Sequence, residues 1–411
     1  MKNKWTWLHT QYGCYVGYIT QAIIVNLPSL LFVTFHTRYG ISLTELSFLV
    51  VLLFVVQILV DLVSAPIVDK VGYRKYTVFG FFCSVAGLVL MSVLPLVMQD
   101  TYAALLIAVT VASAGSGMME VVISPINESL PRPETGAGSM SLLHSFYCWG
   151  VVAVIILSTV YFALFGMANW MYLPMLWAAV PLVGLLMFLK VPLYPLVKEG
   201  KAMPIWQLLK TPTFWAMFLF MIFAGASEQA MSQWASLFAE SGLGVTKAVG
   251  DLMGPCAFAF CMGTARVVFG PYIKWPVHKS LIVCALMCIG CYLTVILSPW
   301  PVISLIGCAL CGFSVGIMWP GTYSLAAGRI PLGGTAMYAL LAMGGDIGCS
   351  LGPAAVGAVT DVLSGSEKVM QWAGQSGDAL MKMGFVLALI FPIGMAYGVW
   401  AFIRRQKKRH K

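Results

Sequence analysis

The run "TYAALLIAVTVASAGSGMMEVVISP", residues 101–125, contains one charged side chain, Glu120, and no lysine or arginine lies within ten positions of it. About 20 consecutive apolar residues cross a bilayer as an α-helix, whereas a strand of a membrane barrel needs only about 10. Backbone polar groups must be satisfied internally within lipid, so a run of this length predicts a membrane-spanning helix.

The composition extends this prediction to the whole chain. Of its 411 residues, 60% are hydrophobic and only 9% are charged, whereas a soluble globular chain carries about 25% charged residues. We expect an all-α polytopic membrane protein. Its twelve predicted transmembrane helices lie near residues 13–35, 43–67, 76–98, 101–126, 138–165, 169–190, 213–238, 249–273, 279–298, 301–325, 334–362 and 379–403.

The basic residues predict the orientation. With a cytoplasmic N-terminus, nineteen of the twenty-four lysines and arginines fall on the cytoplasmic side, as the positive-inside rule requires. We therefore expect both termini in the cytoplasm and a multi-pass protein of the plasma (inner) membrane. The net charge of +9 is then a topology signal and gives no reason to expect a nucleic-acid partner.

The two halves of the chain resemble each other. The segment "DLVSAPIVDKVGYRK" (61–75) matches "ARVVFGPYIKWPVHK" (265–279) when their central prolines are aligned, which places Asp61 opposite Arg266. This internal repeat predicts two pseudo-symmetric six-helix bundles, an arrangement typical of transporters whose halves rock about a site near the midplane.

The predicted boundaries follow from the repeat and from a polar, proline-containing link. They are an N-terminal bundle at 1–190, a cytoplasmic linker at 191–212, a C-terminal bundle at 213–403 and a basic cytoplasmic tail at 404–411.

The stretch "APIVDKVGYRK" (65–75) resembles the loop between the second and third helices of the major facilitator superfamily, with its pattern G-x-L-a-D-R-x-G-R-K. Asp69, Lys70, Gly72 and Arg74 match this pattern, whereas an alanine replaces the first glycine and a tyrosine replaces an arginine. The resemblance implies the fold of that superfamily and a gate at this loop. The expected gate residues, including the aligned pair from the repeat, are Asp61, Asp69, Gly72, Arg74, Lys75 and Arg266.

Within the superfamily, the chain is most similar to the fucose-permease-like sugar symporters. The similarity rests on "GSGMMEVVISP" (115–125), read against that group's G-x-G-x-x-E-x-x-x-N-P, and on "SLLHSFYCWG" (141–150) and "GIMWPGTYSL" (316–325). Ser124 stands where the group has asparagine, and the first helix lacks the group's membrane aspartate. The resemblance implies sugar transport coupled to protons.

Glu120 lies on a polar face of its predicted helix. Ser116, Glu120 and Ser124 are spaced by four residues and so share one helix face. Burial favours the neutral form of a carboxyl group, which makes proton loading and release feasible. We interpret Glu120 as a proton carrier that also hydrogen-bonds the solute, and the alternative is a neutral carboxyl that only bridges two helices.

The fifth predicted span carries His144 and Tyr147 on one face. Histidine titrates near neutrality and is suited to a hydrogen-bond donor or a proton relay. The alternative is a packed histidine bonded to a backbone carbonyl.

The seventh predicted span, "AGASEQAMSQWASLFAE", has a polar stripe that includes Gln229 and Gln233, with Glu228 and Trp234 beside it. Amides and carboxylates offer both donors and acceptors, and indole offers an apolar face, so this set suits a polyhydroxylated ligand. The alternative for each aromatic residue is core packing or contact with lipid. The remaining expected solute contacts are Gln21, Asn26, Trp319 and Tyr323.

Ionisable residues inside a membrane usually face the bundle interior or a water-filled path. Asp346 lies in the middle of a predicted span, in "AMGGDIGCS". We expect it to take part in proton coupling together with Glu120 and Glu228, and the alternatives are pairing with a cation or accepting hydrogen bonds from helix ends.

The cysteine pairs "CIGC" (288–291) and "CALC" (308–311) have a spacing that suggests zinc in a soluble chain. Here both lie within apolar helices, where cysteine is an ordinary small interior side chain. We therefore expect no metal and no cofactor other than the coupling ion.

These observations predict a monomeric secondary transporter that imports a small polyhydroxylated solute, a sugar or a similar molecule, by proton symport. Sodium is the alternative coupling ion. The alternative functions are a proton-coupled exporter of amphipathic compounds and a carrier for organic anions. An enzyme is not expected, because the chain has no nucleophile elbow and no phosphate-binding glycine loop.

Overall fold

The computed structural model describes residues 5–131, 136–194, 202–269, 275–364 and 377–409. In these ranges the chain forms helices and their connections, with no strand, so the predicted all-helical fold is confirmed. The elements are α1 (Trp7–Leu30), α2 (Phe32–Tyr39), α3 (Leu43–Val71), α4 (Tyr73–Val97), α5 (Thr101–Glu128), α6 (Gly136–Phe165), η1 (Met167–Asn169), α7 (Tyr172–Trp177), α8 (Ala179–Phe188), α9 (Ile205–Leu209), α10 (Pro212–Leu243), α11 (Lys247–Asp251), η2 (Leu252–Cys256), α12 (Ala257–Phe269), α13 (Val277–Leu297), α14 (Pro301–Val315), α15 (Met318–Arg329), α16 (Gly334–Ser364), α18 (Gly377–Ala388) and α19 (Ile390–Arg409).

Nine helical stretches in the described ranges are long and apolar enough to span a bilayer. Two shorter apolar helices, Phe48–Ser64 and Tyr172–Phe188, lie in two more of the twelve predicted segments. The predicted span 13–35 is not among the nine, because α1 carries the polar Gln21 and Asn26 and ends at Leu30. Its polar side chains lower its hydropathy and are also what makes it a candidate for solute binding.

The described helices form two compact units. Unit 1 comprises Met1–Ser139, Phe146–Leu208 and Leu332–Met343, and unit 2 comprises Met140–Ser145, Leu209–Pro331 and Gly344–Lys411. The helices α6 and α16 therefore each contribute residues to both units. The predicted domain boundaries remain a prediction.

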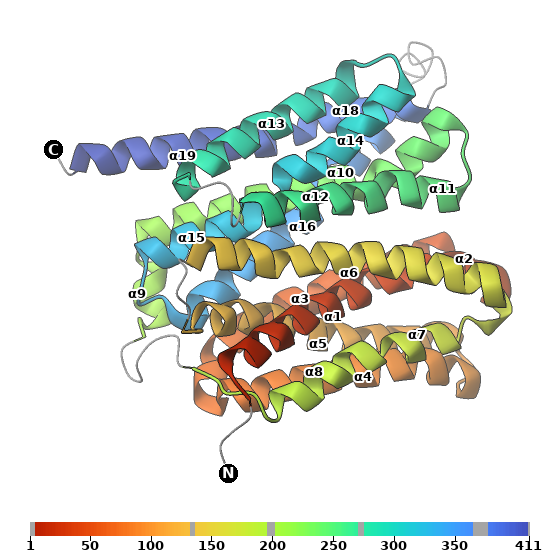
Figure 1. Cartoon of the computed structure of the whole chain (residues 1–411). Helices are drawn as coiled ribbons and strands as arrows, with labels where there is room; N and C mark the ends of the chain where they lie inside the picture. The colour runs from red at the N-terminus through yellow and green to blue at the C-terminus, as the bar shows by residue number, and fades with distance from the viewer. Residues whose placement is uncertain (1–4, 132–135, 195–201, 270–274, 365–376, 410–411) are drawn as a thin grey trace. The chain divides into compact units, whose positions relative to one another are not determined.

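In unit 1 the central helix is α5, which packs against α4, α3 and α1, while α8 packs against α1 and α4. Figure 1 shows these helices running side by side. The core between them is built from apolar side chains such as Leu27, Leu88, Leu105 and Trp170. The approach of α5 to α4 is close at Gly115, where an added Cβ would lie 2.5 Å from Ser84 Oγ.

In unit 2 the corresponding central helix is α14, which packs against α13, α12 and α10, while α19 packs against α13 and α10. Taken in chain order, these are the same pairs as in unit 1. Here too a glycine permits the close approach, because an added Cβ at Gly312 would lie 2.1 Å from the Phe258 carbonyl oxygen. The two units thus bury their central helices in the same way.

Large apolar side chains also remain exposed on the outer helices, among them Phe79 and Phe82 of α4 and Leu286 of α13. An extended exposed apolar surface marks a contact with a partner or with lipid. Together with the spanning helices, it identifies a multi-pass membrane protein.

Candidate functional site

The polar face of α5 lies against two other helices of unit 1. Gln21 Nε2 of α1 donates a hydrogen bond to Glu120 Oε2 at 2.5 Å. On the same face, Ser124 Oγ lies 2.8 Å from the hydroxyl oxygen of Tyr18. The glutamate is 5% exposed and Ser124 is fully buried. We call Tyr18, Gln21, Glu120 and Ser124 the Glu120 cluster.

A carboxyl group bonded to an amide can exist in either protonation state. The amide N–H of Gln21 can donate to a carboxylate or to the carbonyl oxygen of a protonated carboxyl. Neither side chain introduces a fixed positive charge. The Glu120 cluster is therefore suited to gaining and losing a proton without losing this hydrogen bond.

One turn earlier on α5, Gln57 Nε2 of α3 donates to Ser116 Oγ at 3.0 Å. The amide oxygen of Gln57 is buried and has no hydrogen-bond partner within the part of the chain that the structure describes. Buried polar atoms are almost always hydrogen-bonded, so this acceptor is available to a water molecule or a solute hydroxyl. Sequence reasoning missed Gln57 and Tyr18, although the lone amide within an apolar run was a usable signal for Gln57.

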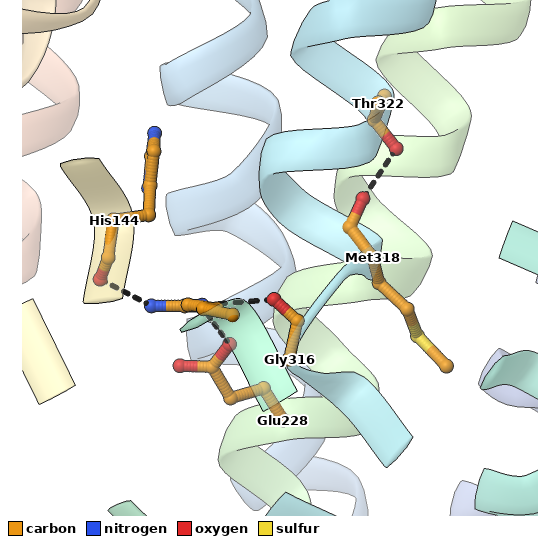
Figure 2. A network of polar contacts seen from close by, with 6 residues as sticks. His144, Glu228, Gly316, Met318 and Thr322 are labelled. Carbon is orange, nitrogen blue, oxygen red and sulfur yellow. Dashed lines mark hydrogen bonds and ion pairs between the residues drawn. The ribbon is translucent and has the colours of Figure 1, made fainter. Parts of the chain in front are cut away.

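A second buried network lies in unit 2 and is built around Arg266 of α12. Its guanidinium donates from Nε to the Gly316 carbonyl at 2.8 Å, from Nη1 to the His144 carbonyl at 3.0 Å and from Nη2 to Glu228 Oε2 at 3.5 Å. Figure 2 shows Gly316, His144 and Glu228 converging on these bonds. Arg266 is 3% exposed. We call Glu228, Arg266 and the two carbonyls the Arg266 network.

The Arg266 network needs a charged carboxylate. A guanidinium has no acceptor and stays protonated, so burying it requires a countercharge and hydrogen-bond acceptors. Glu228 supplies the charge and the two carbonyls supply acceptors. Ser141 Oγ, which donates to the Arg266 carbonyl at 2.6 Å, ties the same helix turn to α6.

His144 takes part in this network through its backbone carbonyl. Its imidazole ring is buried and lies 5.7 Å from the ring of Tyr323, centroid to centroid. Trp319 precedes Tyr323 by one turn of α15, and the two rings are 6.5 Å apart in an edge-on arrangement. Trp319 also packs so closely on α16 that an added Cβ at Gly345 would lie 2.1 Å from its ring.

The other expected solute contacts have varied surroundings. Gln229 and Tyr147 are half-buried, whereas Gln233 is exposed. Trp234 donates from Nε1 to the Pro353 carbonyl at 3.3 Å. Asn26 is half-buried and donates from Nδ2 to the Ala22 carbonyl of its own helix at 2.8 Å.

Two of the expected gate residues lie at helix ends in unit 1. Arg74 donates from Nη1 to the Phe188 carbonyl and from Nη2 to the Val191 carbonyl, both at 2.7 Å, and so fixes the end of α8. Gly72 joins α3 to α4 with φ +89°, a backbone conformation that favours glycine.

Asp61 and Asp346 are both buried, and Lys75 is exposed. The side chain of Asp69 lies outside the described residues. The gate and coupling roles of these residues stay predictions.

The cysteines of α13 and α14 meet in the interior of unit 2. The sulfur atoms of Cys288 and Cys311 are 3.8 Å apart, and Cys308 Sγ lies 3.4 Å from Met231 Sδ. Among the described residues, no group of three or more His, Cys, Asp or Glu side chains is arranged to hold a metal ion.

Several solved structures share the fold of this chain. The crystal structure of the E. coli fucose:proton symporter FucP matches 94% of this chain and 98% of its own, with a TM-score of 0.70 and 16% sequence identity. A structure of FucP in the outward conformation matches 93% of this chain and 97% of its own, with a TM-score of 0.72 and 16% identity.

The structure of the proton:xylose symporter XylE bound to 6-bromo-6-deoxy-D-glucose matches 95% of this chain and 94% of its own, with a TM-score of 0.74 and 12% identity. Identities this low establish the fold alone. No curated protein sequence matches.

The family model of the Major Facilitator Superfamily matches residues 14–353, most of the chain. The resemblance inferred from the loop at 65–75 is thereby confirmed. The protein belongs to the major facilitator superfamily and is a multi-pass membrane transporter rather than an enzyme.

Proposed function

We propose that the protein imports a small polyhydroxylated solute, a sugar or a similar molecule, by proton symport through alternating access. The observation that carries this proposal is the Glu120 cluster. It combines a carboxyl, an amide and two hydroxyl groups on one buried face of α1 and α5. A hydroxyl-rich solute needs both donors and acceptors, and this face supplies both.

The names of the similar structures support the same proposal. FucP is described as a fucose:proton symporter and XylE as a proton:xylose symporter. Those descriptions belong to those proteins, and the shared fold alone does not transfer a substrate. What they add is that this arrangement of helices is compatible with sugar symport.

Glu120 is the proposed proton carrier. Its amide partner does not require a charged carboxylate, so protonation leaves the hydrogen bond to Gln21 in place. A membrane potential contributes about 2.3 kcal/mol per charge per 100 mV, so one co-transported proton supports about 50-fold accumulation of a neutral solute per 100 mV. Asp346 remains a proposed secondary member of the proton path, and Glu228 would join it only by giving up its ion pair with Arg266.

Organic-anion uptake is less well supported. It would need a cation directed at the solute, and the guanidinium of Arg266 is already bonded to Glu228 and to two carbonyls. Export of amphipathic compounds would need an apolar pocket, and the Glu120 cluster is polar. We propose a monomer in the plasma membrane, with both termini cytoplasmic.

The test is uptake of a panel of labelled monosaccharides into proteoliposomes with an inward proton gradient, with and without a protonophore. A matched set with a sodium gradient identifies the coupling ion. The expected result is proton-driven accumulation of at least one sugar, which Glu120→Gln reduces to simple equilibration.

Glu45→Gln, at an exposed helix start in the same unit, serves as the matched control and should accumulate solute normally. Folded protein that takes up no sugar would contradict the proposal and direct the search to amphipathic compounds and organic anions.

A further inference from the structure

The tenth predicted span is interrupted in unit 2, because α14 ends at Val315 and α15 begins at Met318. In a continuous α-helix, the carbonyl of residue 316 would accept a hydrogen bond from the N–H of residue 320. Residue 320 is proline, which has no N–H. The carbonyl of Gly316 therefore lacks its helical donor, whereas the carbonyl of Ile317 accepts from the Gly321 N–H at 2.8 Å.

Arg266 supplies the missing donor. Its Nε–H bonds to the Gly316 carbonyl at 2.8 Å, the shortest of the three bonds of the Arg266 network. The other two bonds, to His144 and Glu228, hold the guanidinium plane in place (Figure 2). A charge-assisted bond from a buried arginine is stronger than the amide bond it replaces.

The consequence reaches the aromatic residues of α15. Trp319 lies in the first turn after the break, and Tyr323 lies one turn further on. The Trp319 ring fits against Gly345 with no space for a Cβ, so a small shift of this turn would displace it. The first turn of α15 is thus contacted by Arg266 at Gly316 and by α16 at Trp319.

We propose that Arg266 is a positioning residue that replaces the hydrogen bond denied by Pro320 and thereby fixes the first turn of α15. The ion pair with Glu228 keeps Arg266 in the position from which it makes this bond. The further statement that this turn presents Trp319 and Tyr323 to the solute rests on the proposed function. The hydrogen-bond replacement itself does not.

A double-mutant cycle tests the replacement directly. Pro320→Ala restores an N–H to residue 320, so the Gly316 carbonyl regains a helical donor and no longer depends on Arg266. The second change of the cycle is Arg266→Met made together with Glu228→Gln in the otherwise unmodified chain, so that neither a carboxylate nor a guanidinium is left buried without a countercharge. The measurement is amide hydrogen exchange of the peptide covering residues 316–323 in the detergent-solubilised full chain.

We expect the paired change to accelerate exchange in this peptide about tenfold, equivalent to about 1.4 kcal/mol, and Pro320→Ala to reverse most of the acceleration. Pro125→Ala is the matched control, because Pro125 also lies within a helix, the central helix α5 of unit 1. Pro125→Ala should reverse none of the acceleration. Equal acceleration with and without Pro320→Ala would overturn the proposal.

Arg266→Lys covers the case in which the methionine variant does not fold. Lysine keeps a positive charge near Glu228 but has no Nε–H and no planar fork. The expected result is a folded protein, judged by size-exclusion chromatography, with faster exchange confined to residues 316–323. Normal exchange there would also overturn the proposal. Neither readout needs a known solute, so a failure of sugar uptake leaves this test valid.

Discussion

Within the described residues each unit buries one glutamate, and the two glutamates have different hydrogen-bond partners. Glu120 of unit 1 is bonded to the neutral amide of Gln21, whereas Glu228 of unit 2 is paired with the guanidinium of Arg266. An amide accommodates a carboxyl with or without its proton, but a buried guanidinium needs the carboxylate. This difference is the reason why we propose proton movement for unit 1 and a positioning role for the ion pair of unit 2, although the central helices of both units pack in the same way.

The largest expected effect comes from removing the positive charge. Arg266→Met leaves Glu228 as an uncompensated buried carboxylate, and breaking a buried ion pair from one side costs about 3–5 kcal/mol. Gln21→Leu, its counterpart in unit 1, removes a neutral hydrogen bond and costs about 1–3 kcal/mol. Thermal unfolding of both variants in the same detergent measures the ranking, and a larger loss for Gln21→Leu would break the comparison.

The next test changes the carboxyl groups themselves. Glu228→Gln removes the countercharge but keeps an oxygen that can accept from the guanidinium, so it is expected to cost less, about 1.5–3 kcal/mol of unfolding free energy. Glu120→Gln leaves an amide facing an amide and is expected to cost less than about 1 kcal/mol. Its effect should instead appear in transport, as lost accumulation with retained binding. Equal destabilisation by the two substitutions would show that charge does not distinguish the clusters.

A third test concerns the close packing of the central helices, which the two units share. Gly115→Ala and Gly312→Ala each place a methyl group within 2.5 Å of a neighbouring helix, and overpacking of this kind costs about 1–3 kcal/mol. Gly290→Ala is the control, because a Cβ there meets no atom within 4 Å. It should be neutral or stabilising by up to about 1 kcal/mol, owing to alanine's higher helix propensity. Destabilisation by only one of the first two variants would mean that the central helices are not packed alike.

The smallest expected effect distinguishes the starts of the two central helices. Asp100 caps α5 by accepting a hydrogen bond from the Ala103 N–H at 3.0 Å, whereas α14 starts after Trp300 without a side-chain cap. Asp100→Ala is therefore expected to cost about 1 kcal/mol, and Trp300→Ala, which removes an exposed ring, less than about 0.5 kcal/mol. Melting curves of the two variants should show this order, and the reverse order would contradict the prediction that capping distinguishes the two helix starts.

Several features could be predicted from local sequence. The loop at 65–75 identified the superfamily, and the periodic placement of Ser116, Glu120 and Ser124 identified the polar face of α5. Pro320 was visible as a helix-breaking residue, so the interruption near Gly316 was accessible in principle. These signals are carried by residues close together in the chain, where helix geometry alone determines which side chains share a face.

Other features could not be predicted in this way. The partner of Glu120 is 99 residues away in the chain, and nothing local distinguishes Gln21 from Gln57 or Asn26 as that partner. The repeat aligned Asp61 with Arg266, but this alignment does not reveal that Arg266 bonds to Glu228 and to two backbone carbonyls. A backbone acceptor leaves no trace in side-chain identity, so the role of Gly316 became visible only in the folded chain.

The sequence by itself determined that this protein is helical, lies in a membrane and belongs to the major facilitator superfamily, because hydropathy and composition add up residue by residue along the chain. Only the tertiary structure decided which glutamate is held by an amide and which by a guanidinium. That choice depends on which helices pack together and at what rotation, and both are properties of the whole unit rather than of any one helix.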